Sequence, residues 1–147
     1  MNGNAPVFTL KVKLLHPAAK LPERRDGDIG WDLFCVSTEE SAPGLVKIKT
    51  GIAVELPSGY WGQVEGRSSM GVKGYDVHGG IIDNIYRGEI MVVLVVHNPS
   101  EKPAINPGDK IAQLIVRKQE DFGWTVEAVE TLSQTERGAG GFGSTGR

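Results

Sequence analysis

The chain has 147 residues, of which 39% are hydrophobic and 23% are charged, and its formal net charge is −2. These values predict one globular domain with a sizeable core, and they argue against broad binding to nucleic acids or acidic membranes. Cys35 is the only cysteine, which excludes an internal disulfide and suits a reducing, cytoplasmic compartment. The longest apolar run, residues 90–96, is far too short to span a bilayer.

Apolar and polar residues alternate along much of the chain with the period of two that is typical of half-buried strands. In chain order, the pattern predicts strands over residues 8–14, 46–49, 52–56, 90–96, 110–116 and 125–129. Residues 90–96 are apolar at every position, which predicts a central strand buried on both faces. Gly and Pro residues separate the strands, and sustained helical periodicity is missing. We therefore expect an all-β sandwich, barrel or jelly roll.

The last eleven residues, 137–147, contain five glycines, two hydroxyl residues, two arginines and one aromatic residue, Phe142. Such a segment cannot build a core, and its glycines keep it mobile until a ligand binds. Its amides, hydroxyls and guanidinium groups suit a phosphate, and Phe142 can lie flat on a planar ring. We expect residues 1–136 to form the all-β domain and residues 137–147 to form a flexible lid. The alternative is a disordered, solubilising terminus.

Three clusters of polar residues interrupt the strand pattern, at residues 30–33, 66–71 and 80–89. In the second cluster, Arg67, Ser68 and Ser69 fit a phosphate cradle, although these residues taken alone favour an ordinary polar turn. In the third, Asp83 fits either a turn residue or a catalytic carboxylate, and Tyr86 fits either a packing aromatic or a ligand contact. The three histidines have no Cys or His partners at ligand spacing, so the sequence predicts no zinc site.

Taken in order, these clusters and the tail resemble the five motifs of the trimeric deoxyuridine triphosphatases (dUTPases). The corresponding segments are residues 30–33, 66–70, 80–88, 107–115 and 137–146. The resemblance extends from residue 8 to the end, and five motifs in order are far more specific than any one of them. Trp31, Ser69 and Ile85 depart from the residues usual at their positions in the family.

The resemblance implies a jelly-roll-like β-barrel protomer that assembles as a homotrimer. Each active site would lie between subunits, with the C-terminal tail of a third subunit closing over it. The implied reaction is hydrolysis of dUTP to dUMP and pyrophosphate by attack of water on the α-phosphorus, with Mg²⁺ held by the triphosphate. Such an enzyme limits uracil in DNA and supplies dUMP for thymidylate synthesis. The resemblance implies neither a nucleic-acid partner nor a membrane partner.

The resemblance also implies roles for individual residues. Asp83 would be the general base, because a carboxylate can orient and deprotonate the attacking water. Tyr86 would lie under the deoxyribose and leave no room for a 2′-hydroxyl. The uracil pocket would be formed by the hairpin over residues 77–80, including Val77 and Gly80, and by Ile82 and Met91.

The phosphate chain would be held by two groups of residues. The domain would contribute Arg67, Ser68, Ser69 and Gln113, and the tail would contribute Arg137, Gly143 and Ser144. Phe142 would cover the uracil. Asp32 would reach the Mg²⁺ ion only through water, so no side chain is expected as a direct metal ligand.

Two other functions compete with this interpretation. A dCTP deaminase shares the implied fold, but enzymes of that kind lack a tail with a stacking aromatic such as Phe142, so the tail argues against it. A non-catalytic protein that binds dUTP and switches a partner is the rival from another class. The presence of Asp83 favours an enzyme that turns dUTP over, and it does not exclude a second, regulatory role for the protein.

Overall fold

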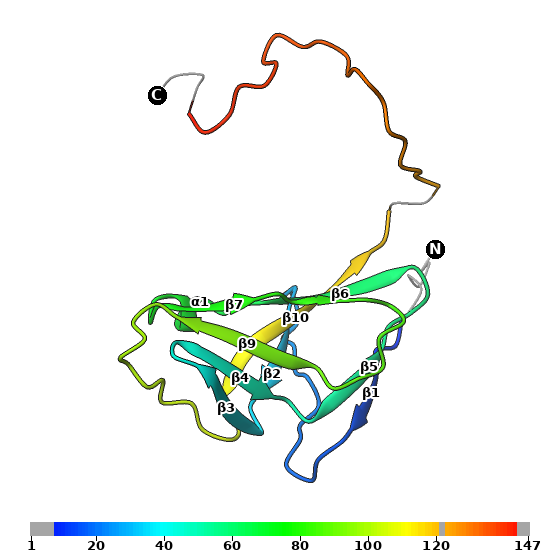
Figure 1. The fold of residues 1–147 in the computed structure, drawn as a ribbon. Coiled ribbons are helices and arrows are strands. Elements are labelled where there is room, and N and C mark those ends of the chain that lie inside the picture. Colours follow the sequence, from blue (N-terminus) through cyan, green and yellow to red (C-terminus); the bar gives the residue numbers. More distant parts are fainter. Residues whose placement is uncertain (1–7, 121–122, 144–147) are drawn as a thin grey trace.

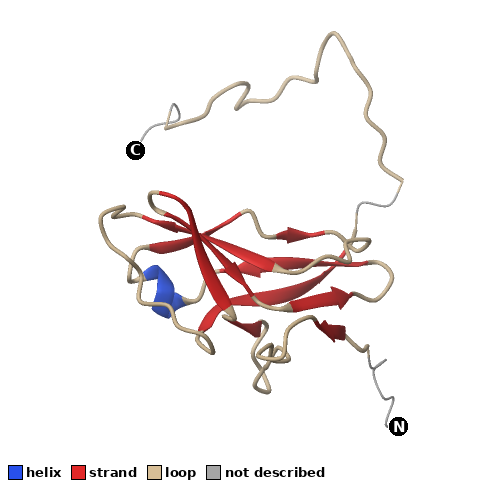
Figure 2. Cartoon of the chain, turned by 60° about the horizontal axis from the view of Figure 1, so that its bottom comes forward, coloured by secondary structure: helices blue, strands red, loops and turns tan. Residues whose placement is uncertain are grey.

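The computed structural model describes residues 8–120 and 123–143, and it confirms the predicted all-β fold. Two four-stranded sheets pack together as a jelly-roll-like sandwich, and a two-stranded sheet extends it (Figures 1 and 2). The pairings between the strands are antiparallel.

The first large sheet has the order β2-β10-β6-β8, formed by Trp31–Phe34, Lys110–Lys118, Tyr60–Glu65 and Ile81–Ile82. The second has the order β3-β4-β9-β7, formed by Ser37–Ala42, Leu45–Lys49, Met91–Val96 and Tyr75–His78. The two-stranded sheet consists of β1 (Lys11–Leu14) and β5 (Ile52–Glu55), and a short helix, α1 (Ser68–Gly71), follows β6.

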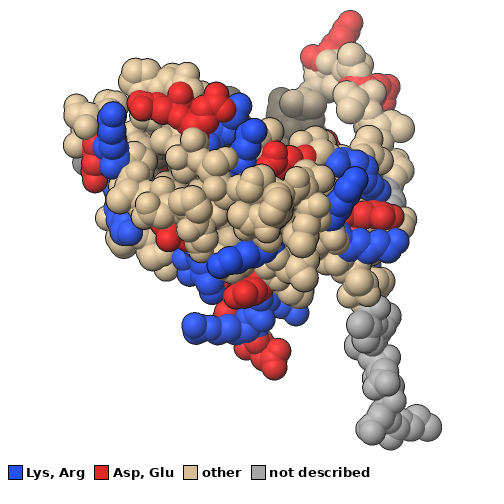
Figure 3. Space-filling view, turned by 90° about the horizontal axis from the view of Figure 1, so that it is seen from below, with Lys and Arg blue, Asp and Glu red and all other residues tan. Residues whose placement is uncertain are grey.

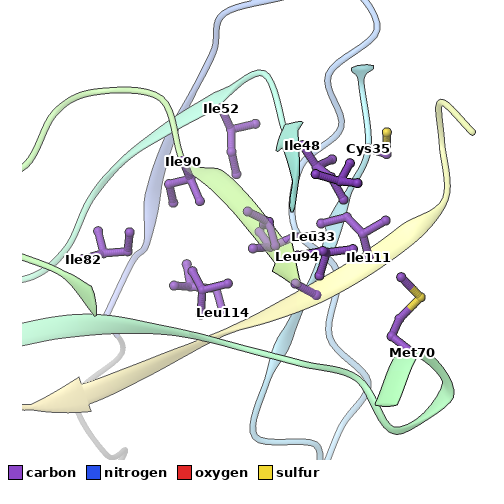
Figure 4. Packing of buried hydrophobic residues seen from close by; sticks show 14 of the residues in the cluster. Leu33, Cys35, Ile48, Ile52, Met70, Ile82, Ile90, Leu94, Ile111 and Leu114 are labelled. Atoms are coloured by element: carbon purple, nitrogen blue, oxygen red, sulfur yellow. The ribbon is translucent and has the colours of Figure 1, made fainter. Parts of the chain in front are cut away.

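The hydrophobic core lies between the two large sheets. Leu33, Ile111 and Leu114 of the first sheet meet Ile48 and Leu94 of the second, and each of these side chains is at most 1% exposed (Figure 4). Burial of one such side chain contributes about 1.5–3 kcal/mol to folding. The core therefore fixes the relative positions of the strands, which carry the polar clusters at their ends and edges.

β9 is a central strand, as predicted, but it is not buried on both faces. It pairs with β4 on one side and β7 on the other. Val92, Leu94 and Val96 point into the core and are buried, whereas Met91 on the opposite face is 40% exposed. Only the inner face packs against the other large sheet, so an entirely apolar sequence correctly indicated a strand and wrongly indicated two buried faces.

The predicted strand over residues 125–129 is wrong. Residues 123–143 contain no strand and form an extended arm that leads away from the sheets after β10 (Figures 1 and 2). Of the apolar residues that suggested a strand, Val126 and Val129 are 104% and 55% exposed, and Trp124 just before them is 83% exposed. Alternation alone cannot make a strand, because the backbone also needs a neighbouring strand with which to pair.

The predicted hairpin over residues 77–80 is also corrected by the structure. β7, which precedes Gly79 and Gly80, pairs with β9 in the second large sheet. β8, which follows them, pairs with β6 in the first. The two glycines therefore carry the chain from one sheet to the other, instead of closing a two-stranded hairpin.

Charged side chains occur in small separate groups on the face shown in Figure 3, around a broad area without charges. No single-sign stripe covers this face, so an anionic ligand here would depend on individual cations. Within residues 8–120 and 123–143, the structure contains no helix that is long and apolar enough to cross a membrane.

Candidate functional site

Asp32, Arg67 and Lys110 form an ion-pair cluster on the first large sheet. One Asp32 oxygen lies 3.2 Å from Arg67 Nε, and the other lies 2.8 Å from Lys110 Nζ. Arg67 also donates from Nη1 to the backbone carbonyl of Lys110 at 3.2 Å. All three side chains are 25–35% exposed. Asp32 thus orients the guanidinium and leaves its remaining N–H groups free to meet an anion from solvent.

Gln113 joins this cluster to the segment that precedes α1. It lies opposite Asp32 in the pairing of β2 with β10, and its Nε2 donates to the carbonyl of Gly66 at 2.9 Å. Gly30 is necessary for this arrangement, because a Cβ at that position would lie 2.1 Å from Gln113 Oε1. The first, second and fourth motifs therefore meet at one place, as the resemblance implies.

Ser68 and Ser69 begin the four-residue helix α1, and both are exposed beside this cluster. A hollow of about 530 Å³ opens next to them. It is lined by Glu65, Gly66, Arg67, Ser68, Gly71, Tyr75, Asp76, Val77 and His78. Burial, followed by the charge and hydrogen bond of Glu101, raises the pKa of Tyr75, so this hydroxyl stays protonated. The hollow joins the predicted phosphate residues to Val77, one of the predicted uracil residues.

Asp83 directly follows β8 at the edge of the first sheet, and its side chain is exposed. The amide of Tyr86 donates to the Asp83 carbonyl at 3.0 Å and closes a turn. The Tyr86 hydroxyl donates to the carbonyl of Glu89 at 2.9 Å, and its ring covers Gly88, where a Cβ would lie 2.4 Å from the hydroxyl oxygen. The same loop therefore fixes the ring of Tyr86 and the backbone of Asp83, whose carboxylate faces solvent.

Asp83 lines a second hollow, of about 540 Å³. The other lining residues are Trp61, Ile81, Asn84, Gln119, Glu120 and Trp124. Of the other predicted uracil residues, Ile82 points into the core and is 8% exposed, while Met91 lies on the outer face of β9. Ile82 can therefore offer a ligand mainly its backbone.

Within one chain, Asp83 lies apart from the ion-pair cluster of Asp32, Arg67 and Lys110. The two hollows share no lining residue. Asp32 lies on β2 at one edge of the first sheet, whereas Asp83 follows β8 at the other edge. Three strand spacings separate these edges, which corresponds to about 14 Å across the sheet between the strands of Asp32 and Asp83.

The tail lies apart from both places. Its arm carries it away from the sheets in both ribbon views (Figures 1 and 2). Arg137 donates from Nε to the carbonyl of Gly140 at 2.9 Å, and Phe142 is fully exposed. Gly143 is also exposed, and Ser144 lies outside the described residues. One chain therefore presents the predicted site in three separate groups.

Two residues with site contacts were missed in the sequence. Lys110 begins β10 and binds Asp32, and Asn84 follows Asp83 and binds the neighbouring β5–β6 turn. A charged residue at the start of a buried strand was a usable signal for Lys110. For Asn84 the sequence offered only the general preference of asparagine for turns.

The connection between β7 and β8 supplies a test of the site's framework. Gly80 has φ +104°, and a Cβ there would lie 2.5 Å from the Val64 carbonyl oxygen, whereas Gly79 has φ +76° and open space around it. We expect Gly80→Ala to destabilise the fold by about 2–5 kcal/mol through strain and overlap. Gly79→Ala should cost only about 1–2 kcal/mol for its backbone angle. Urea unfolding compares the two, and equal losses would contradict the close approach to Val64.

Comparison with known proteins identifies the family of the chain. The dUTPase family model matches residues 16–146. The deoxyuridine 5′-triphosphate nucleotidohydrolase of Clostridium tetani is 41% identical over 145 residues, which cover 95% of this chain and 98% of that protein. The cowpox virus protein of the same name is 40% identical over 148 residues, covering 99% and 97%.

Solved structures show the same similarity. The dUTPase of Staphylococcus bacteriophage 80alpha, solved with dUPNHPP, superposes with a TM-score of 0.77 at 31% identity, over 95% of this chain and 99% of that chain. The native structure named EIAV dUTPase superposes with a TM-score of 0.66 at 28% identity, covering 84% of this chain and 100% of that chain. With its motifs, its fold and its relatives in agreement, the chain belongs to the dUTPase family.

Proposed function

We propose that the chain hydrolyses dUTP to dUMP and pyrophosphate, with Asp83 as the general base. The observation that carries this proposal is the loop after β8, which presents the exposed carboxylate of Asp83 on a hydrogen-bonded backbone and holds the ring of Tyr86 by a further hydrogen bond. Family membership supplies the substrate class, since the relatives are named as deoxyuridine triphosphate hydrolases and a phage relative was solved with dUPNHPP.

In this mechanism, Asp83 accepts a hydrogen bond from a water molecule and takes its proton as the water attacks the α-phosphorus. A carboxylate at the end of a strand suits this task, because its backbone is fixed while its side chain remains accessible to solvent. The bond between the α-phosphorus and its bridging oxygen then breaks, and pyrophosphate leaves. A general base of this kind contributes about 10²–10⁴-fold to the rate.

The phosphate chain would be bound by Arg67, Ser68, Ser69 and Gln113. Asp32 and the Lys110 carbonyl hold the Arg67 guanidinium before the ligand arrives, which reduces the entropy lost on binding. Preorganised donors of this kind stabilise negative charge that develops on the phosphates. In the tail, Arg137, Gly143 and Ser144 would add donors, and Phe142 would stack on the uracil.

The donor set fits a magnesium ion that arrives with the nucleotide. Within the described residues, no group of three or more His, Cys, Asp or Glu side chains is placed to hold a metal. The Asp32 carboxylate is engaged by two cations and would reach the ion only through water. The ion, when bound, neutralises charge on the triphosphate.

We further propose that the working enzyme is a homotrimer with sites shared between subunits. Three observations support this assembly: the separation of Asp83 from Arg67, the distance of the tail from its own domain, and the exposed apolar residues of the arm. Trp124, Val126 and Leu132 would be costly to leave in water, and a neighbouring subunit can cover them. In a cytoplasmic setting, the reaction would limit uracil in DNA and supply dUMP for thymidylate synthesis.

The test of the function is the release of pyrophosphate from dUTP, dCTP, dTTP and UTP. Activity on dUTP alone supports the proposal. Ammonia release from dCTP would indicate a deaminase instead. Tight binding of dUTP without turnover would indicate a nucleotide-responsive binding protein.

Tyr86 provides a test of ribose discrimination. We expect Tyr86→Ala to reduce the preference for dUTP over UTP by about 10–200-fold in kcat/KM, because the ring no longer excludes the 2′-hydroxyl. Tyr86→Phe is the matched control, since it keeps the ring and loses only the hydrogen bond to Glu89. It should retain the discrimination. An unchanged dUTP/UTP ratio in Tyr86→Ala would count against stacking on the sugar.

A further inference from the structure

Asn84 fastens the loop that carries Asp83 to a neighbouring turn. Its Nδ2 lies 2.9 Å from the carbonyl oxygen of Pro57 and 2.8 Å from that of Tyr60, with the Leu56 oxygen farther away at 3.5 Å. A side-chain amide has two N–H donors, so the two short hydrogen bonds use both. All three partners are carbonyl oxygens, which also fixes the orientation of the amide.

The turn that receives these hydrogen bonds is itself rigid. It connects β5 to β6, and the amide of Tyr60 closes it by donating to the Pro57 carbonyl at 3.1 Å. β6 continues from Tyr60 through the centre of the first large sheet, where it pairs with β10. Asn84 is therefore attached to the most extensively paired part of the framework, although it lies in a loop.

The consequences of this attachment extend to Asp83, the preceding residue. Tyr86 fixes the Asp83 carbonyl on one side, and Arg87 Nη1 donates to the backbone carbonyls of Asn84 and Tyr86. These contacts shape the loop internally, but the Asn84 side chain is the one among them that joins the loop to another turn. At the far end of the loop, the Glu89 carboxylate accepts from the Gly51 amide at 2.9 Å, so Asn84 is the attachment that lies next to Asp83. Without it, the segment beside Asp83 would lose its side-chain link to the β5–β6 turn.

We propose that Asn84 is a positioning residue for catalysis, which holds the Asp83 carboxylate at the place from which it activates water. This inference rests on the proposed role of Asp83 as the general base. A displacement of a reacting group by about 1 Å can cost on the order of 100-fold in rate. A side chain that only stabilised the fold would lower stability and leave the turnover of the folded enzyme unchanged.

The experiment compares Asn84→Ala and Asn84→Asp with the wild-type chain, at a temperature where all three remain folded by circular dichroism. Asn84→Asp keeps the shape of the side chain and replaces both donors with an acceptor that faces carbonyl oxygens. Both variants should lose about 10- to 100-fold in kcat with dUTP while KM changes little. Asn98→Ala is the matched control, because it removes an asparagine hydrogen bond from another turn, between Oδ1 and the Ser100 amide. It should keep full kcat.

A second measurement separates positioning from general stability. In the background of Asp83→Asn, the change Asn84→Ala should cause almost no further loss of kcat, because there is no base left to position. An equal loss in both backgrounds, or full kcat in Asn84→Ala, would overturn the inference while the proposed function stands. If the wild-type chain releases no pyrophosphate from dUTP, the proposed function fails and this inference fails with it.

Discussion

Replacement of Asp83 by asparagine should lower kcat for dUTP by about 10²–10⁴-fold and leave nucleotide binding nearly unchanged. The reason is chemical: an amide fills the same space and can orient a water molecule, but it cannot take the proton. The side chain is exposed and has no ion-pair partner among the described residues, so its replacement should not disturb the fold. Steady-state kinetics and calorimetric titration with a non-hydrolysable dUTP analogue measure the two quantities separately.

Asp28→Asn is the control for this experiment. Asp28 is also exposed, and it lies in the loop before β2, in a segment without a proposed role. The control should keep wild-type kinetics. Full activity of Asp83→Asn would remove Asp83 from the mechanism and direct attention to another carboxylate.

Deletion of residues 137–147 should leave a folded, assembled protein that has lost at least about 10²–10³-fold in kcat/KM. The deletion removes the donors of the tail, and the loss of one preorganised donor to developing charge commonly costs that much. The described part of the tail makes its hydrogen bonds within residues 135–140, so the domain should unfold at an unchanged temperature. Kinetics, thermal unfolding and sedimentation measure the three properties. Wild-type rates after the deletion would eliminate the lid.

Mixing two inactive variants tests whether the lid acts between subunits. Chains that carry Asp83→Asn have an intact tail, and truncated chains have an intact Asp83. If the tail closes over another subunit's site, unfolding and refolding the two variants together should restore activity, since a mixed trimer contains some complete sites. If each tail serves its own chain, the mixture should stay inactive.

The strands were predicted well where apolar residues alternate with polar ones because one face of the strand packs against the core. The alternation in residues 46–49 and 52–56 corresponds to β4 and β5, and the apolar run at 90–96 corresponds to β9. Predictions were less accurate where a strand depends on a partner. Residues 8–14 contain a strand only at Lys11–Leu14, the four residues that β5 can pair, and residues 125–129 pair with no strand in the part of the chain that the structure describes.

The candidate site residues were predicted from the motifs. Which of these residues contact one another depends on the fold, and the sequence alone does not show it. The sequence could not show that Asp32 contacts Arg67 and Lys110, because those contacts join segments that are far apart in the chain. It also could not show that Ile82 is buried while Asp83 beside it is exposed, since this depends on where β8 ends. The periodicity of a sequence describes residues along one strand, whereas these contacts and exposures are determined by how the strands pair across the sheet.

The cluster of Asp32, Arg67 and Lys110 has a consequence for the release of product. Two cations and one anion leave an excess of a single positive charge, so the apo cluster attracts anions only moderately. We therefore expect inorganic phosphate alone to bind here more weakly than a nucleotide that is held along its whole length. We also expect the cluster to bind pyrophosphate only moderately once its bond to the α-phosphorus is broken, because pyrophosphate is then no longer linked to the base and the sugar. In the proposed mechanism, Asp32 would thereby favour departure of pyrophosphate as well as orient the arginine.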